Sequence, residues 1–345
     1  MVLDNIKLYN FRSYTEREFV FSPDVTVIVG KNGAGKTNIL EALYVLLQGR
    51  SFRDNDESLL CYTTDWWRVH GFMGDDEREV RYQPGQTAPK QLLVNGVSKG
   101  RFTYKQQLPV VLFEPDDLLL IHGSPSARRA YLDSLLIQTV PTYRTTLARY
   151  ERAVLQRNTI LKKGGSLSAL HDAVFVWDIA LSEYGAEIIT QRRRLVATLN
   201  QQLGKHYTEI AQQSSTFTVT YEPQSKHGSH GLAQLLSRSL EKDRLRGFTG
   251  VGPHRDDVGF VLNGKDARTT ASRGEVRTIV LALKRAELDI LHTTLDVRPL
   301  FLLDDVLSEL DETRQEQVIR TSSQFQRIVT STHIDQSQQT ATLII

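Results

Sequence analysis

Apolar positions in the first fifty residues follow two different periods, one typical of strands and one typical of helices. Residues 25–29 are mainly valine and isoleucine and predict a short buried strand. From residue 39 to residue 47 the apolar side chains recur every three or four positions, which predicts a helix with one buried face. A polar segment with three glycines, 30–37, separates the two patterns. The chain is therefore expected to pass from a strand through a tight turn directly into a helix.

Strand-like patterns also flank this unit. Two apolar bursts within residues 2–21 predict strands that lead into it, with a turn at residues 22–24. Residues 61–113 then form a strand-rich lobe, in which proline–glycine and asparagine–glycine pairs mark the turns. The strands expected in this lobe are 68–72, 79–82, 91–94 and 110–113.

The pattern changes at Ser124, a predicted helix N-cap that is followed by a proline. From there to about residue 213 almost no strand signal remains. The expected helices are 125–139, 141–163 and 167–212. Later elements are a strand at 216–221, a helix across 232–240 and a strand at 258–262. We therefore expect an all-helical arm domain over 124–213, inserted into a discontinuous domain formed by 1–123 and 214–345.

The glycine-rich segment matches the phosphate-binding pattern G-x-x-x-x-G-K-[ST] at every fixed position. It consists of Gly30, Lys31, Asn32, Gly33, Ala34, Gly35, Lys36 and Thr37. A strand, a glycine turn and a helix aim backbone N–H groups and a helix N-terminus at one anionic ligand. Lys36 is then expected on the β- and γ-phosphates and the Thr37 hydroxyl on Mg²⁺. The alternative is a glycine-rich turn in which the lysine occurs by chance. This alternative does not explain the flanking strand and helix.

A second candidate for this chemistry is the apolar run 300–303, which ends in Asp304 and Asp305. In nucleoside triphosphatases with this loop, such a strand lies beside the loop strand, and its terminal aspartate holds Mg²⁺ directly or through water. The next acidic residue orients or deprotonates the attacking water, which assigns that role to Asp305. Taken alone, the same pattern is also typical of a strand that runs into a turn.

Ser272, Gly274 and Glu275 open a helix with a regular apolar face. Because Ser-x-x-Glu is also an ordinary capping box, the spacing does not separate a helix cap from a serine that faces a ligand.

The formal net charge is only +2, so a nucleic-acid surface must come from local patches. The helices 141–163 and 167–212 carry such basic residues. The candidates for DNA contact are Arg149, Arg152, Arg157, Arg192, Arg193 and Arg194. The alternative is a helix face that is simply solvated.

Composition excludes several other classes. Cys61 is the only cysteine, so an intramolecular disulfide and a multi-cysteine zinc site are excluded. The first residues do not form a signal peptide, and no apolar stretch approaches the length of a membrane span. We expect a soluble protein of a reducing cytoplasm without a membrane partner.

The order of the motifs is similar to that of ABC-type ATPase heads of the SMC class. The chain carries, in order, the loop 30–37, the serine motif 272–275, the carboxylate strand 300–305, the segment 308–311 and Ser331-Thr332-His333. Further markers resemble the RecF recombination mediator family more closely. These are NFRSY at 10–14, GRSFR at 49–53, FEPDDL at 113–118 running into SARR at 126–129, and GPHRD at 252–256. Together they span nearly the whole chain.

The resemblance implies an α/β fold, a P-loop ABC/SMC-type ATPase head with an inserted all-helical arm. It implies that Lys36 and Thr37 bind ATP·Mg²⁺ and that Asp304 completes the metal site. Ser272, Gly274 and Glu275 would act in trans on the nucleotide of a second copy, and His333 would sense the γ-phosphate. Asp305 departs from the glutamate usual in ABC heads, and a shorter side chain predicts slow hydrolysis.

The function implied is that of a weak DNA-dependent ATPase, which acts as a switch in recombinational repair and replication rather than as a metabolic enzyme. An ATP-induced homodimer would bind duplex DNA and single-strand/double-strand junctions, and would help to load recombinase with RecR and RecO. The rivals are the ATPase subunit of a membrane transporter, a nuclease with an ABC head, and a scaffold with a structural nucleotide.

Overall fold

The computed structural model describes residues 2–225, 228–332 and 341–345. The chain divides into two compact units. The first consists of residues 1–118 and 280–345, and the second consists of residues 119–279. The helix α9 (Arg273–Leu295) begins in the second unit and ends in the first.

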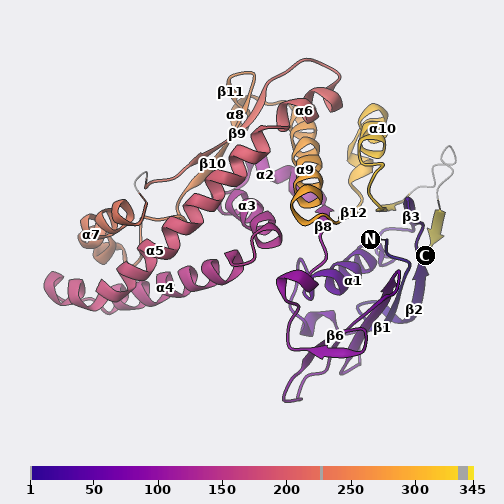
Figure 1. Ribbon diagram of the computed structural model, residues 1–345, viewed down its shortest axis with the longest axis horizontal. Coiled ribbons are helices and arrows are strands. Elements are labelled where there is room, and N and C mark those ends of the chain that lie inside the picture. Colours follow the sequence, from indigo (N-terminus) through magenta and orange to yellow (C-terminus); the bar gives the residue numbers. More distant parts are fainter. Residues whose placement is uncertain (1, 226–227, 333–340) are drawn as a thin grey trace. The chain divides into compact units, whose positions relative to one another are not determined.

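A parallel sheet of five strands forms the centre of the first unit (Figure 1). Its order is β14 (Ala341–Ile344), β3 (Val25–Val29), β13 (Arg327–Ser331), β12 (Leu300–Leu303) and β8 (Val110–Phe113). All neighbouring strands in it run parallel, so their carboxyl ends share one edge. Ligands of open α/β sheets bind outside this edge. The sheet therefore brings the ends of β3, β12 and β13 to one place, although they are far apart in the sequence.

An antiparallel sheet of six strands makes up the rest of this unit's β structure, in the order β2-β1-β4-β5-β6-β7. These strands are β1 (Asn5–Phe11), β2 (Tyr14–Val20), β4 (Trp67–Met73), β5 (Asp76–Tyr82), β6 (Lys90–Val94) and β7 (Val97–Lys99). Strand β4 alternates buried and more exposed positions, as expected for a sheet with one face on a core. The indole of Trp67 is fully buried and meets Phe11 edge to face, with ring centroids 5.5 Å apart. The strands expected at 68–72, 79–82, 91–94 and 110–113 are confirmed, but the last of them is β8 and belongs to the parallel sheet.

The helix α1 (Lys36–Gln48) follows β3 through the glycine-rich turn and contributes its apolar face to the same core. Besides α1 and the second part of α9, the described residues of the unit form α10 (Glu312–Thr321) and the 3₁₀ helices η1 (Glu57–Leu59), η2 (Tyr104–Gln106), η3 (Pro115–Leu118) and η4 (Val306–Glu309).

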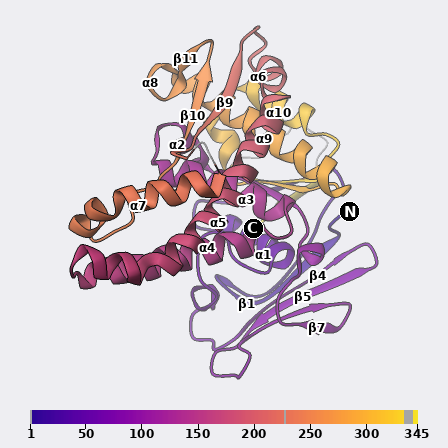
Figure 2. The same cartoon turned by 60° about the vertical axis from the view of Figure 1, so that its left-hand side comes forward.

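Helices dominate the second unit, where α4 and α5 pack side by side and α7 packs against α5 (Figures 1 and 2). Its helices are α2 (Leu119–His122), α3 (Pro125–Thr139), α4 (Tyr143–Lys163), α5 (Leu167–Asn200), α6 (Leu203–Ala211), α7 (Gly228–Arg246) and α8 (Ala267–Thr270). A small antiparallel sheet completes it, with β9 (Phe217–Glu222), β10 (Asp257–Leu262) and β11 (Lys265–Asp266).

The unit differs from the predicted arm in two respects. It continues to residue 279 rather than ending at 213, and it contains a sheet as well as helices. The single helix expected over 167–212 is also wrong, because α5 ends at Asn200 and α6 begins at Leu203. The Asn200 side chain bonds both the N–H and the C=O of Val219, each at 2.8 Å, and so joins the end of α5 to β9. This long-range contact has no local sequence signal.

Ion pairs of two buried arginines connect the helices of this unit. The Arg157 side chain is fully buried on α4 and pairs with Asp178 of α5 at 2.6 Å and Asp243 of α7 at 2.7 Å. Arg192 of α5, 2% exposed, pairs with Asp133 of α3 at 2.8 Å. The prediction that Arg157 and Arg192 contact DNA is therefore wrong. Both fall on the buried stripe of their helix, among apolar residues at helical spacing.

The GPHRD segment is part of the same polar interior. The Tyr150 hydroxyl lies 2.6 Å from His254 Nδ1, and the guanidinium of Arg192 donates to the carbonyl of Pro253 at 2.8 Å. Burial lowers the pKa of His254 to about 4, so its ring is neutral at pH 7. A Cβ on Gly252 would lie 2.4 Å from the Tyr150 hydroxyl, and the φ of this residue is +121°. Only glycine fits at this position.

Replacing Arg157 with alanine tests the role of this interior. The substitution leaves two carboxylates in the interior without their shared cation, so the free energy of unfolding should fall by about 3–5 kcal/mol. The matched control is Arg152→Ala, at an exposed position of the same helix, which should change stability by no more than ~0.5 kcal/mol. Urea denaturation of the full chain measures both. Equal losses in the two variants would contradict a structural role for Arg157.

Candidate nucleotide-binding site

The glycine-rich turn between β3 and α1 has the backbone geometry of a phosphate-binding loop. Gly33 and Gly35 have φ values of +82° and +100°, in the left-handed region that glycine adopts without strain. Gly35 is the N-cap of α1. A Cβ there would lie 2.7 Å from Ser13 Oγ and 2.9 Å from Tyr14 Oη, so the NFRSY segment packs directly against the loop.

The Lys36 side chain packs against the phosphate-binding loop and bonds to its backbone. Its side chain is 5% exposed, and its ammonium group donates to the carbonyl of Gly30 at 3.0 Å and to that of Lys31 at 3.3 Å. A carboxylate oxygen of Asp305 lies 3.6 Å from the same nitrogen. The positive charge thus lies against the phosphate-binding loop, where a phosphate chain would bind.

Asp304 directly follows β12, which is separated from the loop strand β3 by β13, so the expectation that these two strands are neighbours is wrong. The hydroxyl groups of Thr37 and Thr330 both donate to its Oδ1 atom, at 3.0 and 2.9 Å. Burial raises the pKa of Asp304, and these two hydrogen bonds oppose that effect. The contact between Thr37 and Asp304 joins residues 267 positions apart and confirms that the structure brings the two predicted metal ligands together.

The oxygen atoms of Thr37 and Asp304 fit Mg²⁺, a hard cation that keeps several waters and shares phosphate oxygens. Within the described part of the chain, no group of three or more His, Cys, Asp or Glu residues could hold a metal ion. Two oxygen ligands leave the other positions of an octahedral cation to waters and phosphate oxygens, as Mg²⁺ prefers.

Asp305 has an unusual backbone for a non-glycine residue, with φ +52°. Its N–H donates to Thr330 Oγ1 at 2.8 Å, so Thr330 contacts both carboxylate residues of the pair. This geometry directs the Asp305 side chain toward Lys36. Thr330 was not among the predicted site residues, because its only sequence signal is its place on a later apolar strand.

A buried carboxylate behind the loop was also missed. Glu41 of α1 is fully buried and accepts hydrogen bonds from Arg12, Arg53 and Ser51, at 2.6–2.9 Å. Burial raises its pKa, but these three donors outweigh burial and leave the pKa below its usual value. The network fixes the NFRSY and GRSFR segments to the helix of the loop. The sequence signal that could have identified Glu41 is its position on the apolar face of a predicted helix.

The serine motif caps α9. Ser272 Oγ accepts from the N–H of Glu275 at 3.3 Å, and the Glu275 carboxylate accepts from the Ser272 N–H and hydroxyl, both at 2.8 Å. The capping box is therefore formed, and its serine is exposed. Gly274 contributes a carbonyl that accepts from Thr278 at 3.1 Å. A role of this motif in trans stays a prediction, and His333 lies outside the described residues.

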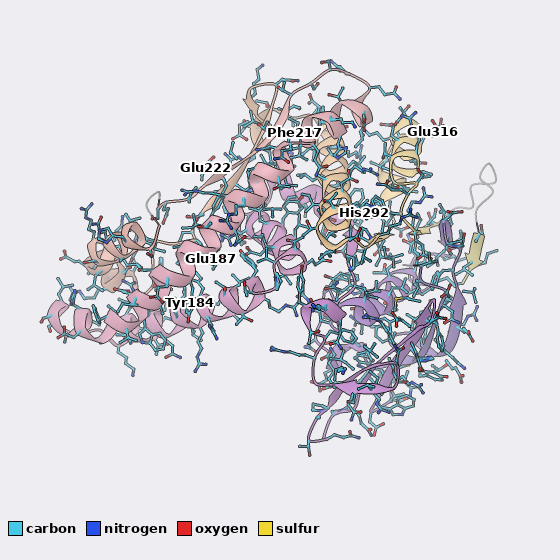
Figure 3. All side chains as sticks on the ribbon, viewed as in Figure 1. Tyr184, Glu187, Phe217, Glu222, His292 and Glu316 are labelled. Carbon is cyan, nitrogen blue, oxygen red and sulfur yellow. The ribbon has the colours of Figure 1, made fainter. Side chains whose placement is uncertain are left out.

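Four of the predicted DNA-contact arginines are exposed: Arg149, Arg152, Arg193 and Arg194. The guanidinium of Arg149 lies 5.9 Å from the ring centroid of Tyr184, which lies on α5 (Figure 3). Arg193 donates to the carbonyl of Ser225 at 3.2 Å. The basic surface is smaller than predicted, because Arg157 and Arg192 are committed to buried ion pairs.

Comparison with known proteins agrees with this geometry. The family model described as RecF/RecN/SMC N terminal domain matches residues 2–344. The DNA replication and repair protein RecF of Streptococcus pneumoniae (strain CGSP14) is 35% identical over 347 residues, which cover 98% of this chain and 94% of that protein. The chain belongs to the RecF family. The RecF protein of Halalkalibacterium halodurans, 34% identical, covers 97% of this chain and 94% of its own length.

Solved structures confirm the fold. The recombination mediator protein RecF with ATPrS, described as part of the RecFOR pathway, has a TM-score of 0.89 and 30% identity and covers 99% of this chain and 95% of its own. RecF with ATP has a TM-score of 0.86 and 31% identity, over 98% and 93%. An SMC head bound to the C-winged helix domain of ScpA, at 15% identity and a TM-score of 0.54, shares the fold. The predicted ATPase-head fold is thus confirmed.

This RecF-family chain shows no helix, among its described residues, that is long and apolar enough to cross a membrane.

One more carboxylate lies close to the site, at the end of β8. Burial raises the pKa of Glu114 to about 7, and the neighbouring charges of Asp117 and Asp304 add to this effect, whereas Lys284 opposes it. Lys284 is buried and pairs instead with Asp117, at 2.8 Å.

The raised pKa of Glu114 predicts a pH-dependent loss of stability. Above the usual glutamate pKa of 4.5, the unfolded chain releases a proton that the folded chain keeps until about pH 7. Stability should therefore fall as the pH rises between these values, and Glu114→Gln should remove this contribution. In nucleotide-free protein, the melting temperature of the variant should equal that of the wild type near pH 4.5 and exceed it by ~2–4 °C at pH 8. A constant difference across this range would contradict the raised pKa.

Proposed function

We propose that this protein is an ATP-dependent DNA-binding protein of recombinational repair and replication, which acts as a homodimer when ATP is bound. The observation that carries this proposal is the arrangement of Lys36, Thr37 and Asp304 around one phosphate-binding loop. Full-length similarity to RecF proteins supports the biological setting. It leaves the transporter-subunit alternative without support.

The chain's own groups account for ATP binding. The N–H groups at the start of α1 and the ammonium of Lys36 would bind the β- and γ-phosphates. Thr37 and Asp304 would hold Mg²⁺, which neutralises charge on the phosphate oxygens when bound. Thr330 would keep the Asp304 carboxylate in its orientation.

Hydrolysis would be slow. Asp305 is the candidate to orient the attacking water, and its carboxylate is one methylene shorter than glutamate. Positioning errors of about 1 Å can cost about a hundredfold in rate. Its contact with Lys36 also competes with that role. His333 is the proposed sensor of the γ-phosphate.

The exposed N-terminus of α9 is the proposed contact with the second copy. A helix of 23 residues presents partial positive charge at Ser272, where anions are stabilised. Ser272, Gly274 and Glu275 would meet the γ-phosphate held by the partner's loop. ATP would join two copies, and ADP, which lacks that phosphate, would do so poorly.

Arg149, Arg152, Arg193 and Arg194 are the proposed contacts with the phosphate backbone of duplex DNA. We further infer binding at single-strand/double-strand junctions, cooperation with RecO and RecR in loading recombinase, and action in the cytoplasm. The RecF structures described within the RecFOR pathway support this setting.

The trans role of Ser272 is tested with Ser272→Asp. Aspartate keeps a good N-cap but places negative charge at the proposed γ-phosphate contact, so the variant should fold normally and stay monomeric with ATP. The matched control is Ser124→Asp, at the N-cap of α3, which should form dimers like the wild type. Light scattering after size exclusion, with ADP and with ATP, gives the result. Dimerisation of Ser272→Asp would rule out the trans contact.

The basic surface is tested by reversing Arg149, Arg152 and Arg194 to glutamate. The slope of log affinity against log salt for duplex DNA should become shallower by about 0.9 for each lost phosphate contact. Lys265→Glu, at an exposed position of the same unit, is the control. An unchanged slope in the triple variant would indicate that these arginines lie on a solvated helix face and do not contact DNA.

A further inference from the structure

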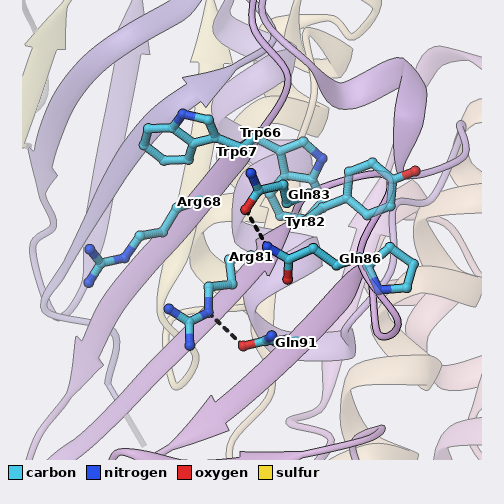
Figure 4. A pocket seen from close by; sticks show the side chains of 9 residues that line it. Trp66, Trp67, Arg68, Arg81, Tyr82, Gln83, Gln86 and Gln91 are labelled. Carbon is cyan, nitrogen blue, oxygen red and sulfur yellow. Dashed lines mark hydrogen bonds between the residues drawn. The ribbon is translucent and has the colours of Figure 1, made fainter.

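A cavity of about 460 Å³ lies in the first unit, at the start of β4 and the end of β5 and beside the loop that joins β5 to β6 (Figure 4). Its volume falls in the range of sites that hold one small molecule. No residue of the phosphate-binding loop lines it. The mechanism proposed above therefore leaves this cavity without a role.

Two like charges face each other in the cavity. Arg68 and Arg81 both line it and are direct partners in the register of β4 and β5, an arrangement that is destabilising without a counter-ion. Both contact the carboxylate of Glu79, at 2.6 Å from Arg68 and 3.6 Å from Arg81, and Arg81 also donates to Gln91 Oε1 at 2.9 Å. The Nε atom of Arg68 is buried without a hydrogen-bond partner. The pair therefore keeps a net positive charge that favours an anionic ligand.

Flat aromatic surfaces and amide groups line the rest of the cavity. Trp66 is 38% exposed, while Tyr82 stacks on the buried Trp67 with ring centroids 5.9 Å apart and is held in place. Gln83 and Gln86 bond to each other at 2.6 Å, and their side chains line the same space. Amides offer both donors and acceptors, so they can meet the edge of a base.

We propose that this cavity binds one unpaired nucleotide. The base stacks on Trp66, its edge meets the amides of Gln83 and Gln86, and its phosphate meets the guanidinium groups of Arg68 and Arg81. Bases in a duplex are stacked on both sides, so only an unpaired base can use an aromatic surface in this way. An acidic peptide would satisfy the guanidinium groups but would leave the aromatic and amide groups without a partner.

The proposal is independent of the ATP-switched duplex binding described above, and the test keeps the two apart. Binding of fluorescein-labelled (dT)20 is measured by anisotropy in EDTA, without ATP. Trp66→Ala should weaken binding about tenfold or more, and Trp66→Phe should restore most of the affinity, because a base–aromatic stack is sequence-tolerant. Arg81→Gln should make the salt dependence shallower by about 0.7 in slope.

The matched control is Phe72→Ala. Phe72 lies on β4, has the same exposure of 38% and does not line the cavity, so its removal should leave the affinity within about twofold. Equal affinities of Trp66→Ala and the wild type, or equal losses in Trp66→Ala and Phe72→Ala, would overturn the proposal. So would displacement of (dT)20 by poly-glutamate at equal charge, which would indicate a site for acidic proteins.

Competition with dAMP separates the two sources of a nucleotide. If dAMP displaces (dT)20 from the wild type but not from Trp66→Ala, the site binds free nucleotides as well as a strand. If dAMP does not displace (dT)20 while (dT)20 binding depends on Trp66, the site binds single-stranded DNA. Binding of a blunt duplex with ATP is measured in parallel and should be the same for Trp66→Ala and the wild type. Loss of duplex binding in Trp66→Ala would overturn a cavity that is specific for unpaired nucleotides.

Discussion

One oxygen atom of Asp304 receives hydrogen bonds from two threonines, and the geometry of the nucleotide site depends on that atom. Thr37 reaches it from the start of α1, and Thr330 reaches it from β13. Because β12 lies between β8 and β13 in a parallel sheet, its end is fixed relative to the loop strand by two neighbours. Thr330 also holds the backbone of Asp305, so the same residue sets the direction of both carboxylates. The two carboxylates beside the phosphate-binding loop are thus positioned by the ends of sheet strands.

The second unit uses charge in a different way. Arg157 and Arg192 connect four helices through buried pairs with Asp133, Asp178 and Asp243. Such pairs add little net stability compared with apolar packing, but a broken pair is costly. They therefore penalise any packing of these helices in which a charge loses its partner. The packing of these helices gains a defined register in this way.

The sequence predicted what depends on local pattern and on fixed spacing. The loop 30–37 could be predicted because glycine, lysine and threonine are each required at set positions, and Asp304 because it ends an apolar run. The partners of Glu41 and the role of Thr330 could not, because they arise from contacts between distant segments. The number of basic residues in the helix led to the wrong prediction that Arg157 contacts DNA, because this number does not say which face of the helix a residue occupies. The end of the second unit was missed because β9 packs against α5, with hydrogen bonds from Asn200, and this contact has no local sequence signal.

The order of these elements along the chain matters during synthesis. The phosphate-binding loop lies within the first 37 residues, whereas β12 and β13 begin at Leu300 and Arg327. While the ribosome is still making the second unit, the loop strand has neither Asp304 nor Thr330 beside it. A nascent chain therefore lacks the contacts of Asp304 with Thr37 and Thr330 until both late strands have emerged. Under the proposed function, nucleotide would control DNA binding only after these strands have joined the sheet.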